Sequence, residues 1–125
     1  METTVLLTLI GTLFLVPIIN IVVGVVSKKN PPKEINRIRG YRTSLSMASQ
    51  EAWDYANMRM AEFMIKIGLY SLLSSIVVGV IVFIAKMGMG IATIVVMVVV
   101  ILQALALMLP IRTIEKELRQ EVYKK

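Results

Sequence analysis

Three side chains able to form hydrogen bonds recur every four residues in the middle of the chain, at Ser49, Trp53 and Asn57. On a helix this spacing places all three on one face. A basic segment that carries Arg42 precedes them. His and Cys are absent, so the chain has neither the commonest general base nor a thiol nucleophile, and a zinc site would need carboxylates alone. The pattern indicates binding, and we expect no enzyme activity, no metal site and no cofactor.

Arg42 is the member of this group whose charge most needs an explanation. A helix is predicted to begin just after Ser49, with Ser46 and Ser49 as candidate N-terminal caps. The positive end of a helix disfavours a nearby cation, so we expect Glu51, Asp54 or a lipid phosphate to compensate the charge of Arg42. The alternative is a solvated loop arginine.

The helix predicted after Ser49 is amphipathic and leads toward an apolar stretch. One face carries an apolar stripe at three- and four-residue steps, and an i,i+4 ion pair between Glu62 and Lys66 lies off it. This helix either continues unbroken into the apolar stretch or lies in the membrane interface and bends near Phe63. In both cases Trp53 and Tyr55 suit the lipid headgroup level. The stripe consists of Trp53, Ala56, Met60, Phe63 and Ile67.

Long stretches of the chain carry no charge at all. The 125 residues are 57% hydrophobic, with a mean hydropathy of +0.77. A membrane-spanning helix needs roughly 20 apolar residues, and three uncharged stretches are long enough, at residues 3–27, 67–85 and 87–111. We therefore predict a single-domain, all-α membrane protein with three transmembrane helices and a cytoplasmic amphipathic extension before the second. The predicted boundaries are spans at about 3–26, 63–85 and 91–109, a cytoplasmic loop at 27–62 and a cytoplasmic tail at 110–125.

The distribution of Lys and Arg predicts the orientation. Seven lie in residues 27–62, five in residues 110–125 and one at Lys66, whereas the connection between the second and third spans holds only Lys86. By the positive-inside rule the N-terminus and this connection face outward, and the loop and tail face the cytoplasm. Because the cations flank membrane spans, the net charge of +6 predicts anionic lipid headgroups as partners rather than nucleic acid. We expect a multi-pass protein of the plasma membrane.

The first apolar stretch has two interpretations, a retained anchor and a cleavable signal peptide. A signal peptide carries basic residues before its apolar run and a small-residue cleavage site after it. Here Glu2 precedes the run, and Lys28 and Lys29 follow it. This order favours a retained anchor whose C-terminal end is cytoplasmic.

Small and polar residues inside the spans predict how the helices pack. Small residues on one face of the second span allow close backbone approach to another span, although chance also explains them. The amides of Asn20 and Gln103 should point into the bundle, either to form interhelical hydrogen bonds or to line a polar path or ligand contact. Pro17 should kink the first span and free a backbone carbonyl. The small-residue ridge consists of Gly68, Ser71, Ser75 and Gly79.

The C-terminal tail has the pattern of an amphipathic helix. Ile111, Ile114, Leu118 and Val122 follow helical spacing. Glu115 with Arg119, and Glu121 with Lys125, are spaced for i,i+4 ion pairs. We expect this helix to lie on the membrane surface or to bind a partner protein.

The central segment also resembles the signature of a known family. Gly40-Tyr41-Arg42-Thr43, followed by Ser46, Ser49, Trp53 and Asn57, is similar to the motif of the SdpI/YfhL family of small bacterial membrane proteins. That motif is Gly, a hydrophobic residue, Arg-Thr, a serine-bearing spacer, a Trp, and an Asn or His four residues later. Where many members have an aliphatic residue before the Gly and a Pro after the Arg-Thr, this chain has Arg39 and Ser44. The resemblance points to Gly40, Arg42, Thr43, Trp53 and Asn57 as the functional or structural centre.

The resemblance implies immunity to a secreted, membrane-active peptide toxin without catalysis, with the motif loop signalling to the cytoplasm. The expected partners are then the peptide toxin and a cytoplasmic regulator or membrane partner, and a homo-oligomer is compatible with the pattern. The alternatives are an accessory subunit of a membrane complex and a small transport component. A proton-coupled exporter needs an acidic residue within a span, and the uncharged stretches have none.

Overall fold

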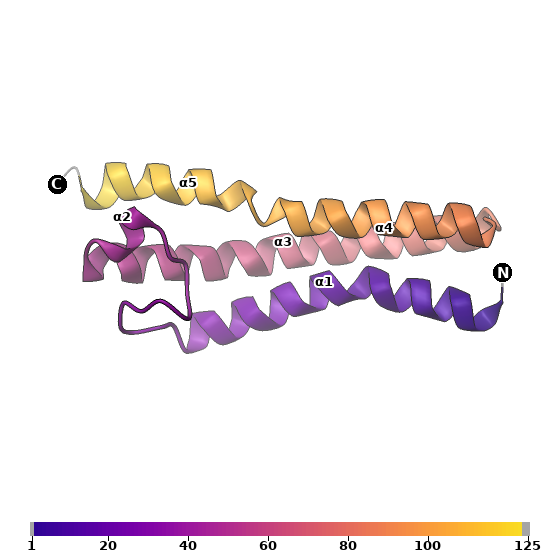
Figure 1. Cartoon of the computed structure of the whole chain (residues 1–125), viewed down its shortest axis with the longest axis horizontal. Helices are drawn as coiled ribbons and strands as arrows, with labels where there is room; N and C mark the ends of the chain where they lie inside the picture. Colours follow the sequence, from indigo (N-terminus) through magenta and orange to yellow (C-terminus); the bar gives the residue numbers. More distant parts are fainter. Residues whose placement is uncertain (1, 124–125) are drawn as a thin grey trace.

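The computed structural model describes residues 2–123, and its regular elements are helices in all of this range (Figure 1). Three of them are long, and two short helical elements follow the third. The elements are α1 (Thr3–Lys29), α2 (Ser44–Met47), α3 (Gln50–Ile84), α4 (Met89–Ala106), α5 (Leu109–Glu117) and the π-helical turn η1 (Leu118–Val122).

The three long helices lie side by side, with α1 and α4 both antiparallel to α3 (Figure 1). The N-terminus and the turn between α3 and α4 lie at one end of the bundle. The loop after α1, α2 and α5 lie at the other end. This grouping is the one that the predicted topology requires, and the side of the membrane to which each end belongs stays a prediction.

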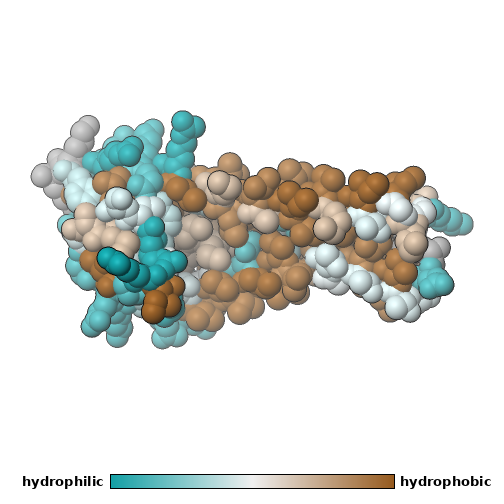
Figure 2. Space-filling view, viewed as in Figure 1, coloured by the Kyte–Doolittle hydropathy of each residue, from teal (hydrophilic) through white to brown (hydrophobic). Residues whose placement is uncertain are grey.

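The surface of the bundle is that of a membrane protein. Figure 2 shows a largely hydrophobic middle and hydrophilic side chains gathered mainly at the end that carries α2 and α5. Three helical segments are long and apolar enough to cross a membrane, namely Thr3–Lys29, Gln50–Ile84 and Met89–Val122. Less than a third of each apolar segment is buried because each helix covers only one face of its neighbour, which suits lipid as the surrounding solvent.

The helix predicted after Ser49 continues into the second span without a break. The alternative of a bend near Phe63 is therefore wrong, since Gln50–Ile84 forms one helix. The ion pair predicted between Glu62 and Lys66 is also wrong. Glu62 instead accepts from Arg59 Nη1 at 2.8 Å, one turn earlier on the same helix.

The end of the third span differs from the prediction. We expected Pro110 to close a span at about 109, but α4 ends at Ala106 and the chain turns at Leu107 and Met108. Pro110 lies in the first turn of α5, where a missing backbone N–H leaves no hydrogen bond unmade. The other helices run close to the predicted limits, with α1 extending to Lys29.

The tail helix packs against its own chain. Ile114 and Leu118 are fully buried against Ala52 and Ala56 of α3. The expectation that the apolar face of the tail lies on the membrane surface or on another protein is therefore wrong for these residues. Glu115 contacts Tyr41 rather than Arg119, and the pair predicted between Glu121 and Lys125 is not described because Lys125 lies outside the described residues.

Candidate functional site

The first turns of α3 carry the three residues that share one helix face. Ser49 caps α3, since its Oγ accepts from the backbone N–H of Ala52 at 3.1 Å. Trp53 and Asn57 follow on the same helix and are both buried, Trp53 completely. The chain that leaves α1 returns across this face, so these residues contact it rather than solvent or lipid.

Trp53 connects α3 to the loop after α1. Its indole Nε1 donates to the carbonyl of Pro32 at 2.7 Å. Because the ring is fully buried within the protein, Trp53 does not contact lipid headgroups, and its level in the membrane stays a prediction. The Asn57 Nδ2 donates to the backbone carbonyl of Trp53 at 2.9 Å, which fixes the orientation of the Asn57 amide.

Gly40 allows the loop to approach Asn57 closely. Its φ of +112° is in the region that side chains disfavour, and a Cβ there would lie 2.6 Å from Asn57 Oδ1 and 3.1 Å from Trp53 Cη2. The same Asn57 Oδ1 accepts the backbone N–H of Tyr41 at 2.6 Å. The glycine of the motif is thus required by backbone conformation and by space.

Thr43 and Ser46 hold the next turn of the loop. Thr43 Oγ1 accepts the N–H of Ser46 at 3.2 Å, and Ser46 Oγ accepts the N–H of Thr43 at 2.8 Å, which is a capping box for α2. Ser46 Oγ also lies 3.0 Å from the carbonyl of Tyr41, to which it can donate. Ser46 therefore belongs to the turn around α2, and the expectation that it caps the longer helix is wrong.

Tyr41 joins the loop to the tail helix. Its hydroxyl donates to Glu115 Oε1 at 2.7 Å, and its ring packs in one cluster with Ile114 and Leu118. Burial and the adjacent Glu115 carboxylate both raise the pKa of the Tyr41 hydroxyl above its ordinary value. Tyr41 therefore remains a neutral hydrogen-bond donor at physiological pH.

A second group of charges ties α5 to α3. Arg59 binds the Glu117 carboxylate through two nitrogens, with Nε–Oε2 and Nη2–Oε1 distances of 3.0 Å. The hydroxyl of Tyr55 donates to the same carboxylate at 2.9 Å. The Arg59 guanidinium also lies 4.6 Å from the centre of the Phe63 ring. The bond from Arg59 lowers the pKa of Glu117.

Arg42 is the motif residue that takes no part in these contacts. It is exposed, and it forms no hydrogen bond or ion pair with any residue in the described range 2–123. The expected compensation by Asp54 is absent, since Asp54 accepts from Gln50 Nε2 instead. Compensation by a lipid phosphate stays a prediction, and Arg42 is free to contact a partner.

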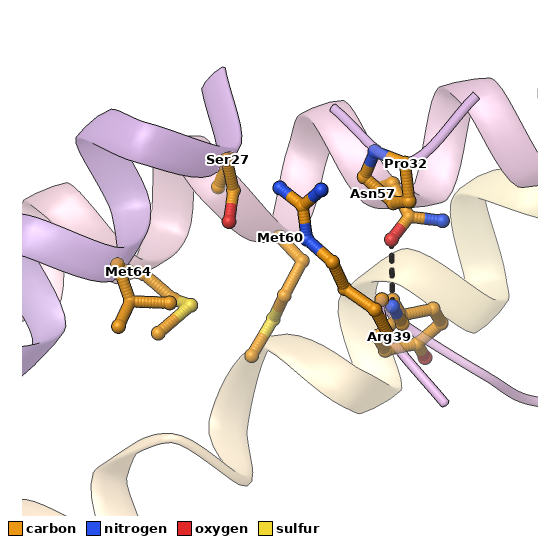
Figure 3. Close-up of a pocket in the computed structure, with 10 residues that line it drawn as sticks. Ser27, Pro32, Arg39, Asn57, Met60 and Met64 are labelled. Carbon is orange, nitrogen blue, oxygen red and sulfur yellow. Dashed lines mark hydrogen bonds between the residues drawn. The ribbon is translucent and has the colours of Figure 1, made fainter. Parts of the chain in front are cut away.

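A pocket of about 260 Å³ lies between the loop, α1 and α3 (Figure 3). Its labelled residues come from all three segments, and the Arg39 side chain extends across it from the loop toward α1. The ten lining residues include Arg39 as their one charged side chain and no carboxylate. They are Val23, Ser27, Pro32, Arg39, Gly40, Tyr41, Asn57, Met60, Ala61 and Met64.

Inside the membrane-spanning part, one polar chain links all three long helices. Pro17 has no N–H, so the carbonyl of Leu13 lacks its helical partner. Ser75 Oγ of α3 lies 2.6 Å from this carbonyl and donates to it. The Gln103 Nε2 of α4 lies 2.8 Å from Ser75 Oγ and 3.1 Å from the carbonyl of Ser71. Gln103 thus forms interhelical hydrogen bonds.

The amide of Asn20, the other polar residue within a span, differs from that of Gln103 in its hydrogen bonding. Its side chain is buried, yet Asn20 Nδ2 has no hydrogen-bond partner among the described residues. Gln103 Oε1 is likewise buried without a partner in that part of the chain. The alternatives of a helix contact and a polar path therefore stay open for Asn20.

The small-residue ridge of α3 is divided into a packed part and an open part. Gly68, Ser71 and Ser75 are buried. A Cβ on Gly68 would lie 2.6 Å from Ile21 Cγ1, so α1 and α3 approach closely there. A Cβ on Gly79 would meet only Leu13 Cδ1, at 3.9 Å, so space remains beside the last member of the ridge.

Comparison with known proteins identifies the family of the chain. The model of the SdpI/YfhL protein family matches residues 33–112, which is more than half of the chain and includes the whole motif. The protein belongs to the SdpI/YfhL family. It is also similar to the protein named "Uncharacterized protein YfhL" of Bacillus subtilis (strain 168), with 47% identity over 49 residues. That alignment covers 39% of this chain and 44% of the relative. No solved structure matches.

In this SdpI/YfhL protein, the motif residues other than Arg42 lie around the start of α3, where hydrogen bonds join Tyr41, Thr43, Ser46, Trp53 and Asn57 into one unit. Sequence reasoning missed the residues that attach this unit to the tail, namely Arg59, Glu115 and Glu117. Glu117 lies between Ile114 and Leu118 in the sequence, so its carboxylate is beside the buried face of the tail helix. That signal indicates a charged partner without identifying Arg59, which is 58 residues away.

Proposed function

We propose that this membrane protein protects a bacterial cell against a membrane-active peptide by binding the peptide, without catalysis. Family membership supplies the context. The observation that supports binding is an open apolar groove of about 500 Å³ between α1 and α3, beside Gly79. Its lining residues are Ile10, Phe14, Ser75, Ile76, Gly79, Val80, Phe83 and Ile84.

This groove suits an apolar helical peptide within the bilayer. Lipid provides no hydrophobic drive between helices, so association there depends on close van der Waals packing at small residues. Gly79 offers such a place because no other helix covers it closely. A peptide seated in the groove would be kept from assembling with other copies of itself or from reaching its target.

The groove is tested by filling it. Gly79→Leu should abolish the survival of sensitive cells challenged with the peptide, because the new side chain occupies the contact surface. Gly11→Leu is the matched control, since Gly11 also lies in a span and has open space where a Cβ would lie, but is outside this groove. Survival should be compared at equal protein levels in the membrane. If cells die equally with and without the wild-type protein under every peptide tried, the proposal is wrong.

We further propose that Arg42 contacts a cytoplasmic regulator and that the motif unit passes the bound state to it. Arg42 is exposed and its side chain contributes no bond to the fold of residues 2–123, so Arg42→Ala should abolish protection at an unchanged protein level. Arg37→Ala removes another exposed arginine from the same loop and should leave protection intact. Equal loss in both variants would indicate a general charge effect and would contradict a specific role for Arg42.

The proposed orientation places the N-terminus outside and both the loop and the C-terminal tail in the cytoplasm. The chain has no native Cys, so Arg42→Cys and Gly88→Cys each introduce one labelling site. A membrane-impermeant maleimide added to intact cells should label residue 88 and leave residue 42 unlabelled. Labelling of both from the same side would overturn the orientation and, with it, the cytoplasmic role of Arg42.

A further inference from the structure

The pocket beside Arg39 lies where α1 ends its membrane-spanning run. Val23 and Ser27, from the last turns of α1, form one side, and Met60 and Met64 of α3 lie opposite. The uncharged stretch that begins at residue 3 ends at Ser27, next to Lys28. This position corresponds to the boundary between acyl chains and lipid headgroups.

Arg39 is held at this boundary by a specific contact. Its Nη2 donates to the carbonyl of Asn30, the residue that caps α1, at 2.6 Å. A guanidinium has five N–H groups, so the remaining donors are available to a ligand. Lys28 and Lys29 occupy the last turn of α1. With no carboxylate in the lining, the pocket attracts a negative group.

The adjoining turn presents an apolar side chain beside these charges. Asn36 Oδ1 accepts the backbone N–H groups of Ile38 and Arg39 at 2.9 and 2.7 Å, which fixes the turn. Ile38, which lies between Arg37 and Arg39 in the sequence, is 89% exposed. An exposed isoleucine between two arginines suits a surface that is anionic at its headgroups and apolar just below them.

We propose that this pocket binds one anionic phospholipid. The headgroup phosphate contacts the free N–H groups of Arg39, while the upper part of an acyl chain lies against Val23, Met60 and Met64. Ile38 enters the same leaflet beside it. The combination of a fixed guanidinium, an apolar wall and a place at the end of a span fits a lipid phosphate better than a soluble anion, which would use only the guanidinium.

The single Trp of the chain provides the reporter. Trp53 lies directly behind the pocket, because its ring is next to Gly40 and its indole N–H binds the carbonyl of Pro32, and both residues line the pocket. The full-length protein is placed in phosphatidylcholine nanodiscs that contain a small, increasing fraction of phosphatidylglycerol brominated near the top of its acyl chains. Quenching of Trp53 should saturate at a low fraction, whereas brominated phosphatidylcholine should quench weakly and without saturation.

Matched arginine variants separate a built site from general surface charge. Arg37→Gln should weaken the apparent affinity by at most about fivefold, the effect of one surface cation near anionic lipid. Arg39→Gln should weaken it by roughly tenfold to a hundredfold, because a charge-assisted hydrogen bond is also lost. Equal losses in the two variants would overturn the proposal.

Two further arms address folding and the source of the phosphate. Ser27→Leu leaves every charge in place but fills part of the pocket, so saturable quenching should be lost while the Trp53 emission in undoped nanodiscs stays that of the wild type. Retained saturable quenching in this variant would overturn the site.

Inorganic phosphate, added to undoped nanodiscs and as a competitor, should change neither the emission nor the quenching. Displacement of the brominated lipid by millimolar phosphate would assign the site to a soluble anion and overturn a lipid site.

Discussion

The two halves of this protein are held together in opposite ways. Where α1, α3 and α4 run together, most apolar side chains face outward, and one chain of hydrogen bonds through Ser75 and Gln103 links the three helices. At the end formed by the loop, α2 and α5, the links are dense, and Trp53, Ile114 and Leu118 are completely buried. Water drives this second half to bury its apolar groups, whereas lipid gives the first half no such drive.

This difference teaches where substitutions should matter. In the membrane-spanning half, a substitution should lower the free energy of unfolding when it obstructs a close backbone approach or leaves a polar atom unsatisfied. In the other half, it should do so when it reduces burial or changes the path of the loop. Four predictions test this contrast, and each is measured as the free energy of unfolding in detergent micelles by SDS titration unless stated otherwise.

The largest effect is expected for Trp53→Ala. The variant removes the largest fully buried side chain and leaves the Pro32 carbonyl without its donor, so it should lower the free energy of unfolding by about 3–5 kcal/mol. Tyr70→Ala is the control, since Tyr70 lies on the same helix but is exposed at membrane depth, and it should change the free energy by less than about 0.5 kcal/mol. Similar losses in both variants would abolish the contrast between the two halves.

Gly40→Ala should have the next largest effect, a loss of about 1–3 kcal/mol, because the positive φ and the approach of Asn57 Oδ1 both oppose a Cβ. Gly11→Ala, in a helix with open space around it, should be neutral or slightly stabilising. Limited proteolysis should cut the Gly40→Ala variant faster in residues 28–42. Unchanged cleavage there would mean that the loop does not depend on this glycine.

Ser75→Ala tests the membrane-spanning half. The variant leaves the Leu13 carbonyl unpaired and should cost about 1 kcal/mol, as interhelical hydrogen bonds in membranes do. Pro17→Ala gives residue 17 a backbone N–H that can bond the Leu13 carbonyl. The double variant should therefore lose less free energy of unfolding than the sum of the losses in the two single variants. Strict additivity would show that Pro17 and Ser75 are not coupled.

The sequence predicted the all-helical class, three membrane-spanning helices and the family, because long uncharged stretches and the spacing of the motif are local signals. It also predicted Ser49 as the cap of α3. It did not predict that the loop would fold back over Trp53, or that Glu117 would bind Arg59. Those contacts join residues far apart in the chain, and periodicity shows only that a face is apolar, not which segment covers it.

The smallest effect concerns the tail and depends on pH. Arg59 lowers the pKa of Glu117 in the folded protein, so docking of the tail is fully supported above the ordinary glutamate pKa of about 4.3 and is lost as the pH falls through the lowered value. This pair is partly exposed, so its loss should weaken docking by only about 0.5–1 kcal/mol.

Hydrogen exchange of the amides of residues 111–123, corrected for its intrinsic pH dependence, should speed up at acid pH in the wild type. Glu117→Gln should show the faster exchange already at neutral pH, whereas Glu121→Gln, at an exposed position farther along the tail, should behave as the wild type does. If Glu117→Gln exchanges as slowly as the wild type at neutral pH, the buried face of Ile114 and Leu118 holds the tail without help from Arg59.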